Sequence, residues 1–251
     1  MKHTMSHKKE IKYYGLHSCL ALFKARKDDI IRIYLDETNV KAFKSALKWC
    51  SEHKKAYHIV SAAELEKVTS SVHHEGVCIL AKELDFVPMD EALKEINSRK
   101  EKCCLLYLDG VQNPHNIGSI VRAMAHFGIP YILGEKGKLP SISPSAYRIA
   151  KGGAEFVRLV ALDKPLDALR KLKQKGFSLV TTSSHGGVSL YKHTFPAHTV
   201  IIMGSESEGV SKELFSLAAD KIQIPGTGAV ESLNVAIATT LCVAEYCRQN
   251  S

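Results

Sequence analysis

The sequence predicts an α/β protein with two parts, a small N-terminal α/β domain and a larger domain built on a parallel sheet. In the second half, short apolar segments alternate with helical stretches, which is typical of a parallel sheet covered by helices on both faces. The first 80 or so residues hold a compact set of similar segments. Between them, the polar stretch DFVPMDEALKEINSRKEK contains Pro88 and is typical of a linker. We therefore expect domains over 13–84 and 103–251, joined by a linker over 85–102.

Composition limits the class of protein. Of 251 residues, 45% are hydrophobic and 24% are charged, which is ordinary for a globular protein. The chain has no run of about 18 apolar residues, so we expect no membrane span. Its first residues lack the apolar stretch of a signal peptide, and the seven cysteines show no zinc-site or disulfide-framework spacing. These features predict a cytoplasmic protein without a metal site.

The charge of the chain is concentrated near its start. The formal net charge is +8, and residues 1–84 hold 15 Lys and Arg against 10 Asp and Glu. Such a surplus suits a polyanionic partner bound mainly by the N-terminal part, but the charge by itself favours the simpler interpretation of a solvated basic surface. The first twelve residues, MKHTMSHKKEIK, are predicted to form a flexible basic arm.

In the N-terminal part, residue patterns predict alternating helices and strands. Val40, Phe43, Leu47 and Cys50 recur at helical spacing within the second helix. The expected helices cover 15–27, 37–52 and 61–67, and the expected strands cover 30–35, 57–60 and 77–81.

The second part repeats a strand-then-helix rhythm. The expected strands cover 103–109, 131–133, 156–160, 177–182, 198–204 and 221–224. One helix is expected directly after Pro88. The other expected helices cover 116–127, 143–151, 164–175, 211–218 and 232–248. Because ligands bind at the carboxyl ends of parallel strands, the loops after residues 108, 182, 203 and 224 are the expected site.

The first candidate motif is NPHNIGSIVRAMAHFGI, residues 113–129. Asn113 and Asn116 are each able to cap a helix start, and the apolar residues that follow share one helical face. Arg122 falls on the opposite, polar face. We expect it near the strand ends and the helix N-terminus, where amides and a guanidinium together favour a phosphate. The alternative is a capped amphipathic helix with one solvated arginine.

Two further motifs follow predicted strands. In IIMGSESEGVS, residues 201–211, a strand ends at Gly204 and a polar loop carries Glu206. The stretch IPGTGAVESLNVAIATTLCVAEY, residues 224–246, leads from a Pro/Gly loop into a helix predicted to hold Ser232 and Asn234 in its first turn. Ser232 suits a helix cap, whereas asparagine is a weak choice inside an apolar helix.

Together, NPHNIGSIVR, GSESEGVS and IPGTGAVESLNVA resemble, in order and spacing, the three motifs of the SpoU/TrmH RNA ribose 2′-O-methyltransferases of the SPOUT superfamily. A weaker similarity joins YYGLHSCLALF, IIRIYLDE and HHEGVCILA to the L30e-like RNA-binding domain that is often fused in front of this catalytic domain. The resemblance implies an S-adenosylmethionine-dependent homodimer with a C-terminal trefoil knot, acting on a ribose 2′-hydroxyl of tRNA or rRNA.

The resemblance also implies roles for individual residues. The matching catalytic positions are Asn116, Arg122, Glu206, Ser232 and Asn234. The matching cofactor-binding positions are Gly204, Ile224 and Leu233, with Thr182 as a weaker candidate.

The resemblance implies that Arg122 is the base that removes the proton of the 2′-hydroxyl. A literal base role is chemically unfavourable for Arg122, because deprotonating a guanidinium is very costly. We expect it to stabilise the forming alkoxide and to bind a neighbouring phosphate, with Asn116 and Asn234 orienting Arg122 and the ribose, and Ser232 fixing the third motif.

The chain departs from the family pattern at Gly226, Ala236 and Lys151. The RNA target is therefore not inferred from the best-known members of the family. The alternative function is an RNA-binding protein that keeps the fold with weak or no catalysis.

Overall fold

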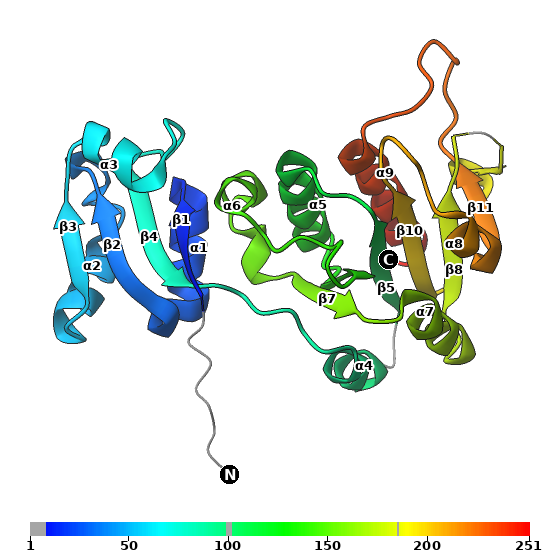
Figure 1. Ribbon diagram of the computed structural model, residues 1–251, viewed down its shortest axis with the longest axis horizontal. Coiled ribbons are helices and arrows are strands. Elements are labelled where there is room, and N and C mark those ends of the chain that lie inside the picture. Colours follow the sequence, from blue (N-terminus) through cyan, green and yellow to red (C-terminus); the bar gives the residue numbers. More distant parts are fainter. Residues whose placement is uncertain (1–8, 99–101, 185) are drawn as a thin grey trace. The chain divides into compact units, whose positions relative to one another are not determined.

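The computed structural model describes residues 9–98, 102–184 and 186–251, and the chain divides into two compact units (Figure 1). The first unit holds residues up to Asp85 together with 143–155. The second holds residues 86–142 and 156–251. The segment 143–155, expected in the second domain, therefore groups with the first unit.

The first unit contains a four-stranded mixed sheet in the order β1-β4-β2-β3. Strand β4 is antiparallel to β1 and β2, and β2 is parallel to β3. The strands are β1 Glu10–Tyr14, β2 Ile30–Leu35, β3 Ala56–Ile59 and β4 Val77–Lys82. The helices are α1 Leu16–Arg26, α2 Lys44–Glu52, α3 Ala62–Thr69 and α6 Pro144–Ala150, with 3₁₀ turns at Lys27–Asp29, Glu37–Asn39 and Gly153–Glu155.

Two expectations for this unit were wrong in detail. Glu10–Lys12 were assigned to the basic arm, but they form the first half of β1 and pair with β4; residues 1–8 lie outside the described residues. The helix expected over 37–52 is divided, because the Asp36 side chain accepts from the backbone of Asn39 and closes a 3₁₀ turn before α2 begins at Lys44.

Arg26 joins the 143–155 segment to the rest of the first unit. Its guanidinium pairs with Glu155 at 2.6 Å and donates to the Tyr13 hydroxyl at 2.8 Å. Burial raises the pKa of Tyr13 to about 12, so this hydroxyl stays neutral. A mostly buried ion pair leaves an uncompensated charge when one partner is removed, which gives the segment a specific attachment.

The second unit is built on a seven-stranded parallel sheet in the order β7-β6-β5-β10-β8-β11-β9. The strands are β5 Cys103–Asp109, β6 Tyr131–Glu135, β7 Arg158–Leu162, β8 Ser178–Thr182, β9 Val188–Ser189, β10 His198–Gly204 and β11 Asp220–Gln223. The helices are α4 Met89–Ser98, α5 Pro114–His126, α7 Pro165–Gln174, α8 Lys212–Leu217 and α9 Val235–Gln249, with a 3₁₀ turn at Leu190–Lys192. The short strand β9 was not predicted.

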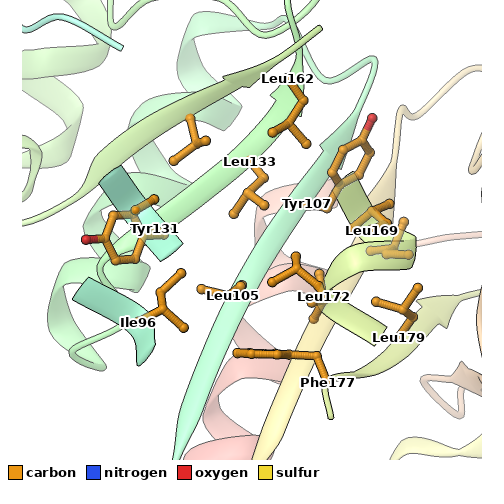
Figure 2. Close-up of a cluster of buried hydrophobic side chains, with 14 of the residues drawn as sticks. Ile96, Leu105, Tyr107, Tyr131, Leu133, Leu162, Leu169, Leu172, Phe177 and Leu179 are labelled. Carbon is orange, nitrogen blue, oxygen red and sulfur yellow. The ribbon is translucent and has the colours of Figure 1, made fainter. Parts of the chain in front are cut away.

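One face of this sheet holds a continuous apolar core (Figure 2). Leu105 and Tyr107 of β5 point to this face because alternate residues of a strand share a face. Helices α4, α7 and α8 cover it; Ile96, Leu169 and Leu172 are among the buried side chains that they contribute. The predicted linker thus includes a helix, α4, that belongs to the core of the second unit. Helices α5 and α9 pack against each other, and α9 also contacts β10.

The sheet order explains where the candidate loops meet. Strands β5, β10, β8 and β11 are direct neighbours, and they are the four strands whose carboxyl ends precede the expected site. The chain passes from β5 to β6 on one side, while β10 lies on the other side of β5. Such a reversal opens a crevice at the carboxyl ends of the strands.

Candidate active site

Three side chains, one from each motif, form a hydrogen-bonded cluster at the carboxyl ends of β5 and β10. Asn116 Nδ2 donates to Glu206 Oε1 at 3.1 Å. Asn234 Nδ2 donates to the same oxygen at 2.7 Å and to Asn116 Oδ1 at 2.9 Å. The backbone N–H of Val235 approaches Glu206 Oε1 at 3.4 Å. The three motifs therefore meet at one carboxylate oxygen.

Asn116 reaches the cluster from the first turn of α5. Asn113 is the N-cap, since its side chain accepts from the backbone of His115, and Pro114 occupies the first turn, where its missing N–H costs no helical hydrogen bond. The helix was expected to start at 116, but it starts at Pro114. Asn116 is buried, which is uncommon for an asparagine and is explained by its partners.

Asn234 has a different place from the one expected. It precedes α9 as the N-cap, and its Oδ1 accepts from the backbone of Ala236 at 3.0 Å and Ile237 at 3.3 Å. The prediction that 232–234 lie in the first turn of the helix was wrong. An asparagine is favoured at a cap and disfavoured within a helix, which removes the anomaly noted in the sequence.

The amide of Asn234 is fully used by these contacts. Its two N–H groups donate to Glu206 and Asn116, and its oxygen accepts from two backbone groups. Its carbonyl must face the helix, so its nitrogen must face the carboxylate. This directionality makes Asn234 a positioning residue for Glu206 and Asn116.

Glu206 stands on a tight loop after β10. The loop closes through the backbone N–H of Gly209, which donates to the Ser205 carbonyl at 3.0 Å. A Cβ on Gly204 would lie 2.0 Å from the carbonyl carbon of Gly209, so only glycine fits there. This close packing explains why the strand ends in glycine.

Asp109 was missed by sequence reasoning. It is the last residue of β5, and its carboxylate accepts from the backbone of Ser211 at 2.8 Å, just before α8. A polar residue at the end of an otherwise apolar strand was the available signal. Asp109 ties the strand before the first motif to the loop of the second.

Arg122 and Ser232 are not part of the cluster. Arg122 is exposed on α5, six residues beyond Asn116 and hence about 9 Å along the helix axis, at 1.5 Å per residue. The expectation that it lies beside the helix N-terminus was therefore wrong. Within residues 9–98, 102–184 and 186–251, its guanidinium has no hydrogen-bonding or ion-pairing partner. Ser232 is exposed in the loop before α9.

The cofactor-binding candidates lie at neighbouring strand ends. Thr182 ends β8 and pairs with Ile222 of β11, Gly204 ends β10, and Ile224 directly follows β11. Leu233 is 42% exposed in the loop that leads to α9. The Thr182 hydroxyl has only long contacts, with the Ile202 carbonyl at 3.5 Å and the Met203 sulfur at 3.8 Å.

The loop between β11 and α9 has the donor set of a site that binds through its backbone. Residues 225–234 are exposed, and the Ala229 N–H makes a long contact of 3.4 Å with the Thr227 hydroxyl. Exposed backbone N–H and C=O groups beside Val230 and Leu233 suit a heteroaromatic ligand with polar edges. These residues therefore fit a nucleoside-containing cofactor.

Three further findings concern metal ions, membranes and cysteines in the described residues. They contain no group of three or more His, Cys, Asp or Glu side chains placed to hold a metal ion. None of their helices is long and apolar enough to cross a membrane. The seven cysteines are free thiols.

Family models match both parts of the chain. Residues 103–244 match the SpoU rRNA Methylase family, and residues 13–87 match the RNA 2′-O ribose methyltransferase substrate binding family. The protein belongs to the SpoU methylase family. It is accordingly a SpoU-family RNA methyltransferase, as the three motifs predicted.

Individual relatives agree with this assignment. The chain is 36% identical over 241 residues to an uncharacterized tRNA/rRNA methyltransferase, YfiF, of Escherichia coli O157:H7. This match covers 96% of this chain and 69% of the relative. It is 31% identical over 242 residues to the 23S rRNA (guanosine-2′-O-)-methyltransferase RlmB of Pseudomonas syringae, with 96% of each chain covered.

Solved structures support the fold. The structure of the SpoU methyltransferase AviRb from Streptomyces viridochromogenes, in complex with AdoMet, is similar to this SpoU-family chain with a TM-score of 0.77 at 20% identity. The match covers 96% of this chain and 90% of AviRb. An A. aeolicus TrmH/SpoU tRNA modifying enzyme has a TM-score of 0.54 at 31% identity, covering 64% of this chain and 83% of its own.

Proposed function

We propose that this protein transfers the methyl group of S-adenosylmethionine to a ribose 2′-hydroxyl of tRNA or rRNA. The observation that carries the proposal is the Asn116–Glu206–Asn234 cluster, in which the three family motifs meet at one oxygen. The RlmB relative, named as a 2′-O-methyltransferase, supports the ribose as the acceptor. Action on tRNA or rRNA would place the protein in the cytoplasm.

The cofactor would lie against the loops after β8, β10 and β11, held by the backbone around Thr182, Gly204 and Ile224 and by the apolar side chain of Leu233. Bound there, it supplies a methyl group on a positively charged sulfur, which is open to in-line displacement. The protein then has to align the 2′-oxygen with that methyl and to favour loss of the hydroxyl proton.

Glu206, Asn116 and Asn234 would hold the loops of the site in one arrangement, with Ser232 fixing the exposed turn before α9. Arg122 would stabilise negative charge on the 2′-oxygen and bind an adjacent phosphate. Since its guanidinium has no partner within the described residues, we propose that Arg122 acts in the site of a second copy. A homodimer is further supported by the exposed apolar residues Leu233 and Ile237 at the start of α9.

The N-terminal unit would bind the RNA substrate, as the match of residues 13–87 to a substrate-binding family supports. Its assignment as an L30e-like domain and the C-terminal trefoil knot stay predictions. The domain boundaries 13–84, 85–102 and 103–251 likewise stay a proposal. The segment 143–155, although inside the last range, groups with the first unit.

The test is methyl transfer from labelled S-adenosylmethionine to total RNA from a strain that lacks this protein. Products are mapped by resistance to alkaline cleavage, which needs a free 2′-hydroxyl. Label at one ribose supports the proposal. Arg122→Ala should reduce the rate by about 100- to 1,000-fold, as for loss of a group that stabilises a developing charge, and Arg122→Lys should fail similarly because it lacks the planar fork.

The same experiment decides against the alternative. A protein that binds RNA, but neither binds S-adenosylmethionine nor transfers label, would be an RNA-binding protein that keeps the fold without the activity. Robust transfer by Arg122→Lys would contradict the geometric role given to the guanidinium.

A further inference from the structure

One face of the four-stranded sheet in the N-terminal unit is only partly covered. Alternate residues of the strands pack into two layers. Toward α1 and α2, the layer of Tyr13, Ile33 and Ile79 is fully buried. On the other face, α3 covers the end of the sheet that holds Tyr14, Cys78 and the half-buried Tyr34 (Figure 1). The side chains of Leu65 and Val68 pack there.

Beyond α3, neighbouring strands place two cationic side chains, Lys12 and Arg32, in one row with Leu80 and Ala56. Lys12 pairs with Leu80, Leu80 with Arg32, and Arg32 with Ala56, so these residues share one face. Lys12, Arg32 and Ala56 are exposed, and Leu80 is half-buried. We call the surface formed by Lys12, Arg32, Tyr34, His58 and Leu80 the open sheet face.

Two aromatic rings border this row. Tyr34 and His58 lie opposite each other on β2 and β3, and their rings stack with centroids 5.3 Å apart and planes inclined by 20°. The Arg32 guanidinium donates to the Tyr34 hydroxyl at 3.1 Å. The His58 side is exposed because β3 is the edge strand. The exposed His58 ring, stacked on the half-buried Tyr34, is therefore presented to solvent with the Arg32 cation at its border.

The charge of the surface selects among possible ligands. Lys82 lies at its margin, where its ammonium is 4.0 Å from the Asp29 carboxylate, and Glu10 is a further acidic neighbour, so Lys12 and Arg32 are the cations that define the surface. A row of cations beside an aromatic stack suits a ligand that carries negative charges next to flat apolar faces. Single-stranded RNA has this chemistry: phosphates pair with the cations and unstacked bases stack on the rings.

We propose that the open sheet face binds an unpaired stretch of the substrate RNA, with a base stacked beside Tyr34 and His58 and its phosphates on Arg32 and Lys12. This inference rests on the proposed RNA substrate and adds to it the surface and the single-stranded form. Duplex RNA is a poor ligand for such a surface because its bases are already stacked.

The test uses the full-length protein and fluorescence anisotropy with a labelled single-stranded RNA and a duplex of the same length. His58→Ala and Tyr34→Leu should each weaken single-strand binding about 5- to 150-fold, the range for loss of one stacked base. Tyr34→Leu keeps an apolar side chain against α3. Arg32→Gln should weaken binding and lower the slope of log affinity against log salt by about 0.7.

Two matched controls lie on the same unit. Tyr57 is on β3 beside His58 but pairs with Ile33, on the opposite face, and is 40% exposed. Lys48 is an exposed basic residue of α2, on the covered side of the sheet. Tyr57→Leu and Lys48→Gln should leave single-strand affinity within about twofold of the wild type. Equal losses in these controls, or equal binding of duplex and single strand by the wild type, would overturn the inference.

The methyl-transfer assay separates this inference from the proposed function. If both hold, the open-face variants raise KM for RNA and leave S-adenosylmethionine affinity unchanged. A protein that methylates RNA with an unchanged KM in these variants would refute the inference alone. A protein that binds single-stranded RNA through this face but transfers no methyl would refute the function alone.

Discussion

The Asn234 side chain donates to the Glu206 carboxylate at 2.7 Å, although 28 residues separate the two in the chain. The same amide caps α9 through its oxygen. Because one side chain holds the motif-two loop and starts the last helix, a change at either residue should disturb both elements.

Removal of the Glu206 carboxylate should destabilise the site through unpaired donors. Glu206→Ala leaves two side-chain N–H donors and the Val235 N–H without their shared acceptor, so we expect the free energy of unfolding to fall by about 1–3 kcal/mol and methyl transfer to be lost. Glu206→Gln retains an acceptor oxygen and should restore most of the stability. Denaturant unfolding compares the variants; equal instability of the two would contradict an acceptor role.

Replacement of Asn234 separates capping from its donor role. Asn234→Asp keeps a good cap but places a carboxylate against Glu206, whereas Asn234→Ser keeps the cap without the like charge. We expect Asn234→Asp to be the less stable of the two at neutral pH, and both to lose most methyl transfer. If the aspartate variant unfolds like the wild type, Asn234 serves α9 alone.

A methyl group at position 204 should disrupt the loop. In Gly204→Ala, the added Cβ meets the backbone of Gly209 and Val210, which cannot move aside cheaply, so we expect a loss of about 1–3 kcal/mol and weaker S-adenosylmethionine binding. Gly226→Ala is the control for stability alone, because no atom lies within 4 Å of its added Cβ but Gly226 belongs to the loop proposed to hold the cofactor. Calorimetry of cofactor binding, with thermal unfolding, tests both; a normal Gly204→Ala protein would show that the loop is looser than its packing indicates.

The pH dependence of stability should include a contribution from His193. Burial lowers its pKa, which Asp220 only partly opposes, and its Nε2 is buried without a partner in the described part of the chain. The unfolded chain therefore binds the proton more readily. The stability that neutral His193 provides is present above its unfolded pKa of about 6.5 and is lost as pH falls through the lower folded value.

His193→Phe should flatten the fall in stability between about pH 7 and 5, as measured by urea unfolding at several pH values. The exposed His126→Gln is the control and should leave that slope as in the wild type. An unchanged slope in His193→Phe would assign the acid sensitivity to other groups.

Local sequence determined most of the secondary structure. Strands β2, β5 and β10 have the predicted bounds, because continuous apolar and β-branched runs between turn residues have few other solutions. The two-residue strand β9 was missed because it carries no periodic pattern. Its pairing depends on the close approach of Gly187 to the Lys221 carbonyl, which is a tertiary contact.

At the site, the sequence motifs predicted which residues form the cluster more accurately than they predicted where those residues lie in the helices. Asn116, Glu206 and Asn234 were chosen by motif and are joined in the structure, but Asn234 proved to be a cap. Arg122 was expected beside the helix N-terminus, but six residues separate it from Asn116, which is about 9 Å along the helix axis at 1.5 Å per residue.

The sequence by itself determined the fold class, the family and the four strand ends that form the site. Those follow from periodicity and from motifs that lie within single segments. Only the tertiary structure decided that β5, β10, β8 and β11 are neighbours, that α4 completes the core of the second unit, and that 143–155 packs with the first. The physical reason is that strand order and segment packing depend on which apolar faces bury each other across long chain separations, which no local pattern records.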